Sequence, residues 1–489
     1  MGESLTEVRA QFNGSVRVEV RPGHLTSDAG VIALREALER LQMIEWLKTH
    51  LQDERNPELI TYPLAELVTT AVLLLAQGYR DHDDSDALRH DAALRMAVSE
   101  RKGTSPLVVP ERPEGTPAPK NPPHPEHLAS QPTLSRLTAM LDRTGARALL
   151  REGLAVMAGR RLRAQRGGHR KRYLTLDVDS LPVEVHGHQP EAAYNGHYHV
   201  TMYHPLVAML GETGDLVDLD LRRGNAHTAE GALGFIEPLI DRLERDVCQI
   251  AAVRIDAGFP AEEPLRGLER RRTPYVARVK NNAVLDRMAE PYLHRPPGRR
   301  PAEPRTWLYE MTYQAESWSR TRRVVLVVLE REDDLFLHHF WLITNWTPEQ
   351  MSAEALLDMY RQRGTAEGHF GELMSVLDPA LSSSPRPKET YAGHRPARLY
   401  TSVDAFAVNE VRLLLNAWAY ASMHVCRTLM AKATGEGWSL KRLRERVLKV
   451  AARVLVSGRR VTFVIAKTSE SLWQGLWQEL GQLSCPDTA

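Results

Sequence analysis

Cysteine is scarce in this sequence of 489 residues. The three cysteines, Cys248, Cys426 and Cys485, lie far apart along the chain. An odd number at these spacings excludes a disulfide scaffold and forms no zinc-ligand pattern. We therefore expect a protein of a reducing compartment, and the expected location is the cytoplasm.

Long apolar runs and nucleotide-binding fingerprints are also missing. The longest strongly apolar run, residues 67–76, is much shorter than the ~18 residues that a membrane span requires. The opening segment, MGESLTEVRAQFNG, contains acids and no apolar core, so we expect no signal peptide. Neither a GxxxxGK[ST] loop nor a dinucleotide fingerprint after a strand is present. We expect no membrane partner and no nucleotide cofactor.

An excess of one charge is absent overall but present locally. The chain has 63 Lys and Arg against 62 Asp and Glu, a net charge of +1. Residues 143–172 nevertheless hold ten basic side chains and one acid, Glu152, and residues 441–460 hold eight basic side chains and one acid, Glu445. Such segments attract a phosphate backbone or form a solvated helix face, and charge alone favours neither.

Hydrophobic periodicity predicts helical ends and a mixed centre. Apolar residues recur at helical spacing through residues 28–102, and prolines then crowd the segment 104–132. Strand-like alternation begins at Tyr173 and is interleaved with helical patterns as far as residue 377. We predict an α/β fold with a helical N-terminal region (1–130, linker at 104–132), a basic helical segment (131–172) and a helical C-terminal region (401–489).

Two predicted strands place carboxylates where chemistry is possible. Asp179 lies in the strand TLDVDSL, and Asp177, two residues earlier, shares its face. Asp256 ends the apolar strand AAVRIDAGF. Because a buried unpaired charge is very costly, such acids are either solvated strand ends or members of a metal site. Hard carboxylate oxygens suit Mg²⁺ or Mn²⁺.

A third carboxylate lies on a predicted helix later in the chain. Tyr360, Arg363 and Glu367 are separated by three and four residues, which places them on one helical face. Arg363 suits either a bidentate phosphate contact or a salt bridge. A tyrosine at Tyr360 is typical of the core or rim of a helix. Lys280 follows the strand YVARV, and this pattern is typical of a surface-loop residue.

Several segments together resemble the insertion-sequence DDE transposases known as transposase DDE domain group 1. The similar segments cover nearly the whole chain: SDAGVIALRE (27–36), GYRDHDDSDALRHDAALRMA (78–97), LASQPTLSRL (128–137), LDVDSLPVEVHG (176–187), RIDAGF (254–259) and NEVRLLLNAWAY (409–420). The resemblance implies an RNase H-like catalytic core at residues 173–282 and 346–400. It also implies a β-rich insertion at 283–345, between the second and third catalytic carboxylates.

The resemblance assigns the catalytic carboxylates, which are also the metal ligands, to Asp179, Asp256 and Glu367. Asp177 remains the alternative for the first position, because it obeys the same strand geometry. The family signature Tyr-x2-Arg-x3-Glu-x6-Lys ends in Met374 here, so its last phosphate contact is absent or comes from another side chain. The expected DNA contacts are Tyr360, Arg363, Lys280, Arg170, Lys171 and Arg172.

The resemblance implies an endonuclease and strand-transfer enzyme that moves a mobile element. Two Mg²⁺ ions, or Mn²⁺ in their place, would serve the hydrolysis of each element end and the attack of its 3′-hydroxyl on target DNA. The expected partners are double-stranded terminal inverted repeats, target DNA and a second copy of the chain. We expect end recognition in the N-terminal helices and the basic segment. A nuclease that does not join ends and a non-catalytic DNA-binding relic remain alternatives.

Overall fold

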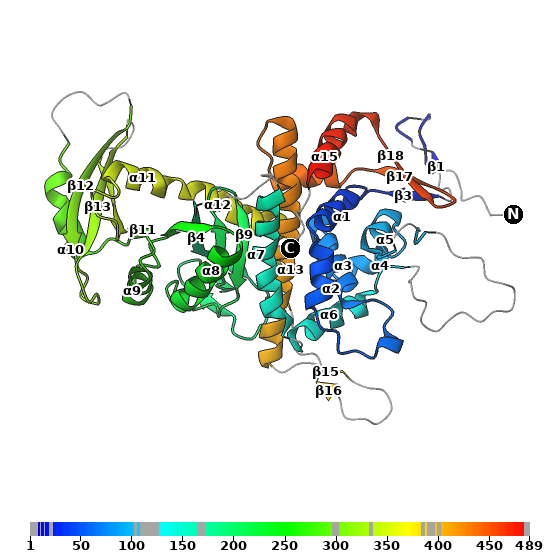
Figure 1. Cartoon of the computed structure of the whole chain (residues 1–489), viewed down its shortest axis with the longest axis horizontal. Helices are drawn as coiled ribbons and strands as arrows, with labels where there is room; N and C mark the ends of the chain where they lie inside the picture. Colours follow the sequence, from blue (N-terminus) through cyan, green and yellow to red (C-terminus); the bar gives the residue numbers. More distant parts are fainter. Residues whose placement is uncertain are drawn as a thin grey trace.

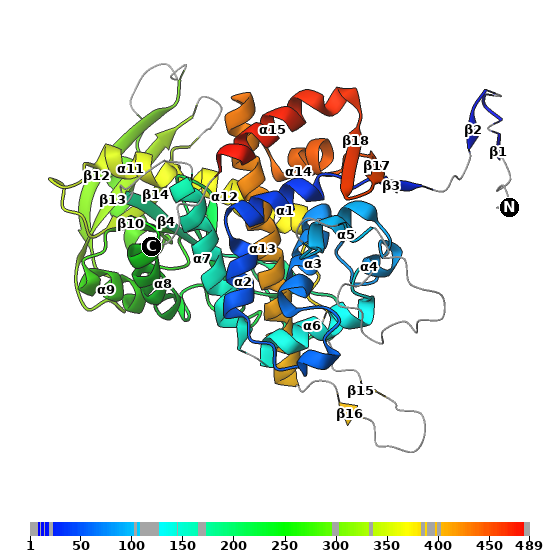
Figure 2. The ribbon, with the colours of Figure 1, turned by 45° about the vertical axis from the view of Figure 1, so that its right-hand side comes forward.

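A computed structural model describes most of the chain, and its described residues are 8–9, 11–13, 15–18, 23–101, 105–107, 127–143, 145–164, 173–295, 303–331, 336–382, 387–388, 397–398 and 402–483. A large mixed sheet occupies one end of the long axis, and a bundle of helices occupies the other (Figure 1). The long helix α13 (Ser402–Thr434) runs between these two parts in both views (Figures 1 and 2). The predicted α/β class is confirmed.

The large sheet has eight strands. In spatial order they are β12 (Arg305–Tyr313), β13 (Arg322–Glu330), β14 (His338–Thr344), β11 (Tyr275–Val279), β10 (Gln249–Ile255), β4 (Tyr173–Ser180), β8 (Leu206–Leu210) and β9 (Asp215–Asp220). Strands β4, β10 and β11 are parallel, and the other pairs are antiparallel. The central strands are buried on both faces, as their runs of branched apolar residues predict.

Helices cover both faces of this sheet. On one face, α8 (Ala232–Asp246), α9 (Glu262–Arg271) and α10 (Ala283–Ala289) share one apolar core with the strands. On the other face, α11 (Ala353–Arg361) packs Leu356 and Leu357 on strands β11, β13 and β14. The segment 283–345 was expected to form a β-rich insertion. Its strands β12, β13 and β14 continue the main sheet, because β14 pairs with β11.

The helical part combines segments from both ends of the sequence. Helix α13 packs against α1, α3, α6, α7 and α15, so the N-terminal and C-terminal helices share one core. The helices of this bundle are α1 (Val31–Arg40), α2 (Met43–His50), α3 (Leu64–Gln77), α4 (Asp84–Ala87), α5 (Ala92–Val98), α6 (Gln131–Arg143), α7 (Ala146–Ala164), α14 (Leu440–Leu443) and α15 (Glu470–Gln482). The sequence suggested two separate helical regions, whereas the structure packs them together.

The predicted all-helical C-terminal region also contains strands. β17 (Ala452–Ser457) and β18 (Arg460–Ile465) form a hairpin, and β3 (His24–Thr26) adds a third strand. Gly458 allows the tight turn because its φ of +56° lies in the left-handed region. The prediction of helix here was wrong, because the alternating pattern of RVLVSGRRVTFVI matches strands.

The remaining strands are short. They are β1 (Val8–Arg9) with β2 (Arg17–Val18), β15 (Pro387–Lys388) with β16 (Ala397–Arg398), and the sheet of β5 (Val183–Glu184), β7 (Val200–Tyr203) and β6 (Ala193–Asn195). Most of the proline-rich linker predicted at 104–132 lies outside the described residues. In the part of the chain that the structure describes, no helix combines the length and apolar character needed to cross a membrane.

Candidate active site

Asp179 and Asp256 lie side by side at one edge of the large sheet. Asp179 is the next-to-last residue of β4, and Asp256 follows the last residue of β10. The two strands are parallel and adjacent, with Val178 paired to Ile255. Because parallel strands end at the same edge, this register places the next residue of each strand together. The spacing of the sequence alone did not reveal this register.

Glu367 reaches the same place from helix α12 (Arg363–Glu372), which follows α11 after a turn at Gln362. Arg363 connects the two elements. Its Nη2 donates to Asp179 Oδ2 at 2.7 Å, and its Nη1 donates to Glu367 Oε1. The Arg363 side chain is 7% exposed and that of Asp179 17%, whereas the Glu367 side chain is 58% exposed. The predicted helical face is therefore directed at the predicted strand carboxylate.

The charges at this site are coupled. Burial raises the pKa of Asp179 to about 6, against the lowering effect of Arg363, and the charges of Asp256 and Glu367 add to the rise. Burial also lowers the pKa of Arg363, but the surrounding carboxylates, Asp179 first, raise it overall. One guanidinium thus faces three carboxylates, and the site holds more negative charge than Arg363 neutralises.

Asp177 has a different environment from Asp179. Its two carboxylate oxygens accept from Arg254 Nε at 2.5 Å and Nη2 at 2.7 Å, and both side chains are at most 2% exposed. Arg254 Nη1 also donates to the carbonyl of Met359 at 2.6 Å, which ties β4 and β10 to α11. Gly211 packs against this pair, since a Cβ there would lie 2.6 Å from Asp177 Oδ2. Asp177 is therefore engaged by a structural ion pair, and this favours Asp179 as the chemical carboxylate.

The other predicted DNA contacts lie in different surroundings, and three of them lie outside the described residues. Tyr360 packs beside Phe340, with ring centroids 6.4 Å apart, and burial raises the pKa of Tyr360 to about 12. Lys280 is exposed just after β11, at the same sheet edge as Asp256. Arg170, Lys171 and Arg172 lie outside the described residues. Met374 is half-buried against the large helical core, so this position directs an apolar side chain inward.

Sequence reasoning missed two residues beside the carboxylates. Burial and then the charges of Asp179 and Asp256 raise the pKa of Tyr198, which places its phenol near both acids. The ring of His204 lies edge-on to Tyr198 at 5.9 Å, and His204 Nδ1 contacts the carbonyl of Ala226 at 2.9 Å. His204 is 3% exposed, and burial lowers its pKa, so the imidazole is neutral. The sequence signal for Tyr198 was the run YNGHYH at residues 194–199.

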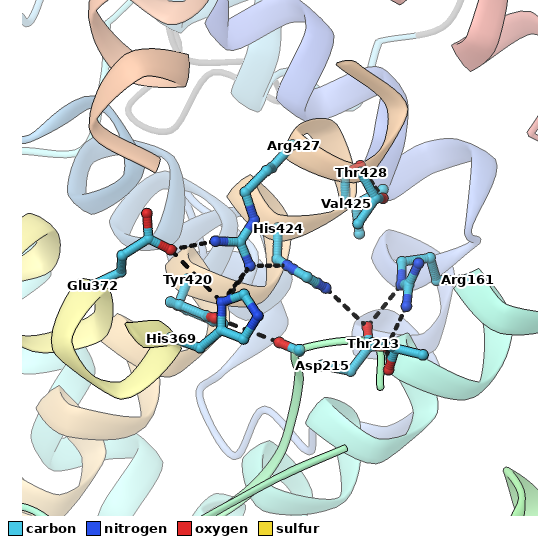
Figure 3. Close-up of polar contacts among 11 residues, drawn as sticks. Arg161, Thr213, Asp215, His369, Glu372, Tyr420, His424, Val425, Arg427 and Thr428 are labelled. Carbon is cyan, nitrogen blue, oxygen red and sulfur yellow. Dashed lines mark hydrogen bonds and ion pairs between the residues drawn. The ribbon is translucent and has the colours of Figure 1, made fainter. Parts of the chain in front are cut away.

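A buried polar network holds the C-terminal end of helix α12 against α13 (Figure 3). Arg427 of α13 donates to Glu372, His369 and His424. Glu372 Oε1 also accepts the backbone N–H of Leu440 at 2.8 Å. Burial and then the charge of Arg427 hold the pKa of His424 well below its ordinary value. Neutral His424 therefore accepts from Arg427 through Nδ1 and presents Nε2–H toward Asp215, 3.6 Å from Oδ1.

The donor set at the sheet edge fits a divalent metal ion chemically. Asp179, Asp256 and Glu367 supply the hard oxygen ligands that Mg²⁺ and Mn²⁺ take in proteins. Within the described ranges, no three His, Cys, Asp or Glu side chains are arranged so that they could hold a metal ion. In this structure Arg363 ion-pairs two of the three carboxylates, Asp179 and Glu367. A cation bound here would replace Arg363 as their partner.

Comparison with known proteins identifies the family. The family described as "Transposase DDE domain group 1" matches residues 8–384 and 397–483. The chain belongs to this family. The resemblance seen in the sequence is confirmed, and membership makes the chain a DDE transposase, of a family that acts on DNA with divalent metal ions.

Other comparisons add little to this assignment. No curated protein sequence matches the chain. Among solved structures, a piggyBac transposase synaptic complex with hairpin DNA aligns over 96% of this chain and 89% of that chain, at 10% identity and a TM-score of 0.37. The transposase assignment therefore depends on the family match.

Proposed function

We propose that this transposase hydrolyses phosphodiester bonds at the ends of a bacterial insertion sequence and joins the freed 3′-hydroxyls to target DNA. The observation that carries the proposal is the convergence of Asp179, Asp256 and Glu367 on the Arg363 guanidinium. Three carboxylates from two parallel strands and one helix meet at the carboxyl edge of the sheet, where α/β proteins commonly place their sites. The strand order β9-β8-β4-β10-β11 supports an RNase H-like core.

The proposed chemistry assigns a role to each side chain. Asp179, Asp256 and Glu367 would hold two Mg²⁺ ions, which supply activation of the attacking oxygen and stabilisation of the leaving oxygen in an in-line displacement. Arg363, released from the carboxylates, would present its two N–H donors to a phosphate of the DNA. Lys280 lies at the same edge of the sheet, and Tyr198 is electrostatically coupled to Asp179 and Asp256; both side chains would orient the DNA strand.

Pairing two element ends requires two such sites, so we propose a homodimer in the DNA complex. Water would be the nucleophile in the first step and the 3′-hydroxyl in the second. The same carboxylates can serve both steps, because the site acts on phosphate oxygens and reads no base.

The test is cleavage and joining of a labelled DNA fragment that carries the element's own end, with Mg²⁺ or Mn²⁺. We expect Asp179→Asn, Asp256→Asn and Glu367→Gln to abolish both products while end binding survives. The matched control is Asp358→Asn, because the Asp358 side chain is 74% exposed on the neighbouring helix α11. Cleavage without joined products would support a nuclease instead. End binding without cleavage in either metal would support a non-catalytic relic.

A further inference from the structure

The sheet of β3, β17 and β18 has one buried face and one exposed face. Ala452 points inward and packs with Ala29 and Trp473. Val454 is buried on the same face, where its cross-strand partner is the half-buried Phe463. The side chains on the opposite face are all exposed, and we call them the outer face: Leu25, Arg453, Leu455, Ser457, Arg460, Thr462 and Val464. Arg459 lies beside them at the hairpin turn.

The structure places five of the eight basic residues at 441–460 in two different settings. One group stabilises the fold. Arg444 donates to the carbonyls of Leu75, Ala76 and Val376, and Lys449 pairs with Asp28 Oδ1 at 2.7 Å. These side chains are not available to a partner, and the sequence did not distinguish them from the rest of the cluster.

A second group of basic residues lies on and beside the outer face. Arg453, Arg459 and Arg460 are exposed, and among the described residues their side chains form no ion pair or hydrogen bond. Exposure alone does not explain this, since Arg245, at 68% exposure, still pairs with Asp246 at 2.9 Å. The outer face and the adjoining hairpin turn therefore present three guanidinium groups and no carboxylate.

We propose that the outer face binds the phosphate backbone of double-stranded DNA, an inference that rests on the proposed function. Charge complementarity favours DNA over a second copy of the chain, because two copies meeting here would bring arginines of like charge together. Arginine guanidinium groups suit phosphate oxygens, and the exposed Leu455 and Val464 beside them suit sugar and thymine methyl surfaces.

The outer face lies away from the candidate active site. The β17–β18 hairpin and strand β4, which carries Asp179, lie on opposite sides of α13 in both views (Figures 1 and 2). The DNA that it contacts is therefore flanking duplex and not the scissile phosphate. Loss of the contact should weaken DNA binding and leave the cleavage rate at saturating DNA unchanged.

The test measures how salt affects binding of the full-length protein to a fluorescent duplex of arbitrary sequence. The patch variant is Arg453→Ala/Arg459→Ala/Arg460→Ala. The control, Arg40→Ala/Arg245→Ala/Arg320→Ala, removes the same charge from exposed arginines that already have carboxylate partners. Each lost phosphate contact should reduce the slope of log K against log[KCl] by about 0.9, so we expect a loss of about 2 to 3 in the patch variant alone.

Further outcomes decide between the remaining explanations. Replacing the same three arginines by lysine should restore the slope, which a folding defect would not allow. An unchanged slope in the alanine variant overturns the proposal, provided that the wild type binds duplex. If the alanine variant instead dissociates a wild-type dimer in sedimentation and keeps the slope, the outer face is a subunit interface and the proposal is wrong. Absence of cleavage by the wild type would refute the proposed function separately.

Discussion

Replacing Arg363 by glutamine should destabilise the metal-free protein and increase its affinity for Mg²⁺. Arg363 is the buried cation that compensates Asp179 and Glu367. Without it, three carboxylates face one another with no counter-charge, and a divalent ion no longer has to displace a guanidinium. The same variant should cleave DNA more slowly, since the proposed phosphate donor is gone. Stronger metal binding together with weaker catalysis distinguishes this account from general damage.

The magnitude follows from the burial of the two partners. Breaking a buried pair by removing one member costs about 3 to 5 kcal/mol, whereas an exposed pair contributes about 0 to 1 kcal/mol. Asp179 is 17% exposed and Glu367 58% exposed, so the Asp179 pair dominates. We expect a loss of roughly 2 to 4 kcal/mol at pH 8, which lowers the Tm by roughly 2 to 4 °C for a chain of this length.

The pH dependence has a definite sign. Burial raises the pKa of Asp179 to about 6 from 3.8, so the folded state binds more protons than the unfolded state between these values. Stability therefore falls as the pH rises from about 4 to about 6, and Arg363 limits that fall. The deficit of Arg363→Gln should be full at pH 8 and should shrink below pH 6, where protonated Asp179 needs no partner.

Calorimetric melting with and without Mg²⁺ measures both effects. An ion at one hundred times its Kd stabilises the folded state by about 2.7 kcal/mol. The Tm gain from Mg²⁺ should be larger for Arg363→Gln than for the wild type, and titration calorimetry without DNA should give a lower Kd. The control is Asp179→Asn/Arg363→Gln, which should lose the extra gain. Equal Mg²⁺ responses in the variant and the wild type would refute the role of Arg363 as a substitute for the metal ion.

Three further predictions concern other buried groups. Burial, and then the charge of a neighbouring glutamate, raise the pKa of Glu66 from 4.5 to about 7. The free energy of unfolding should therefore fall by about 3 kcal/mol as the pH rises across this window. Denaturation of Glu66→Gln at a series of pH values should not show this fall. Arg427→Gln releases Glu372 and should slow DNA cleavage at saturating DNA by about tenfold or more, with unchanged DNA affinity. Arg427→Lys should retain most of the rate. Equal cleavage rates for the wild type and both variants would contradict this prediction. Asp177→Asn leaves Arg254 buried without a carboxylate and should cost about 3 to 5 kcal/mol in urea denaturation, in contrast to a surface change of within about 0.5 kcal/mol.

Local pattern predicted the elements that carry the candidate site. The strands around Asp179 and Asp256 have apolar runs, and the helical face of Arg363 and Glu367 follows from offsets of one turn. These features depend on nearby residues, which is why the sequence reveals them. The choice between Asp179 and Asp177 needed a residue 77 positions away from Asp177, since Arg254 engages one and not the other.

Long-range pairing explains what the sequence did not predict. The strands at 305–344 have ordinary β patterns, but nothing local indicates that they add to the edge of β11. The hairpin at 452–465 follows a basic helical run, so its alternation was read as a continuation of helix. Packing decided both cases, since the buried partners, such as Trp473 for the hairpin, come from other segments.

The attachments of α12 suggest how metal binding and the helical part of the protein are related. At one end, Arg363 joins α12 to the sheet through Asp179, and at the other end Arg427 joins α12 to α13 through Glu372. Glu367 lies between these two ion pairs, so its position depends on both. A metal ion at the carboxylates would release the first attachment and leave the second in place. The Arg427 network would then be the fixed point that holds Glu367 in position while Arg363 turns toward DNA.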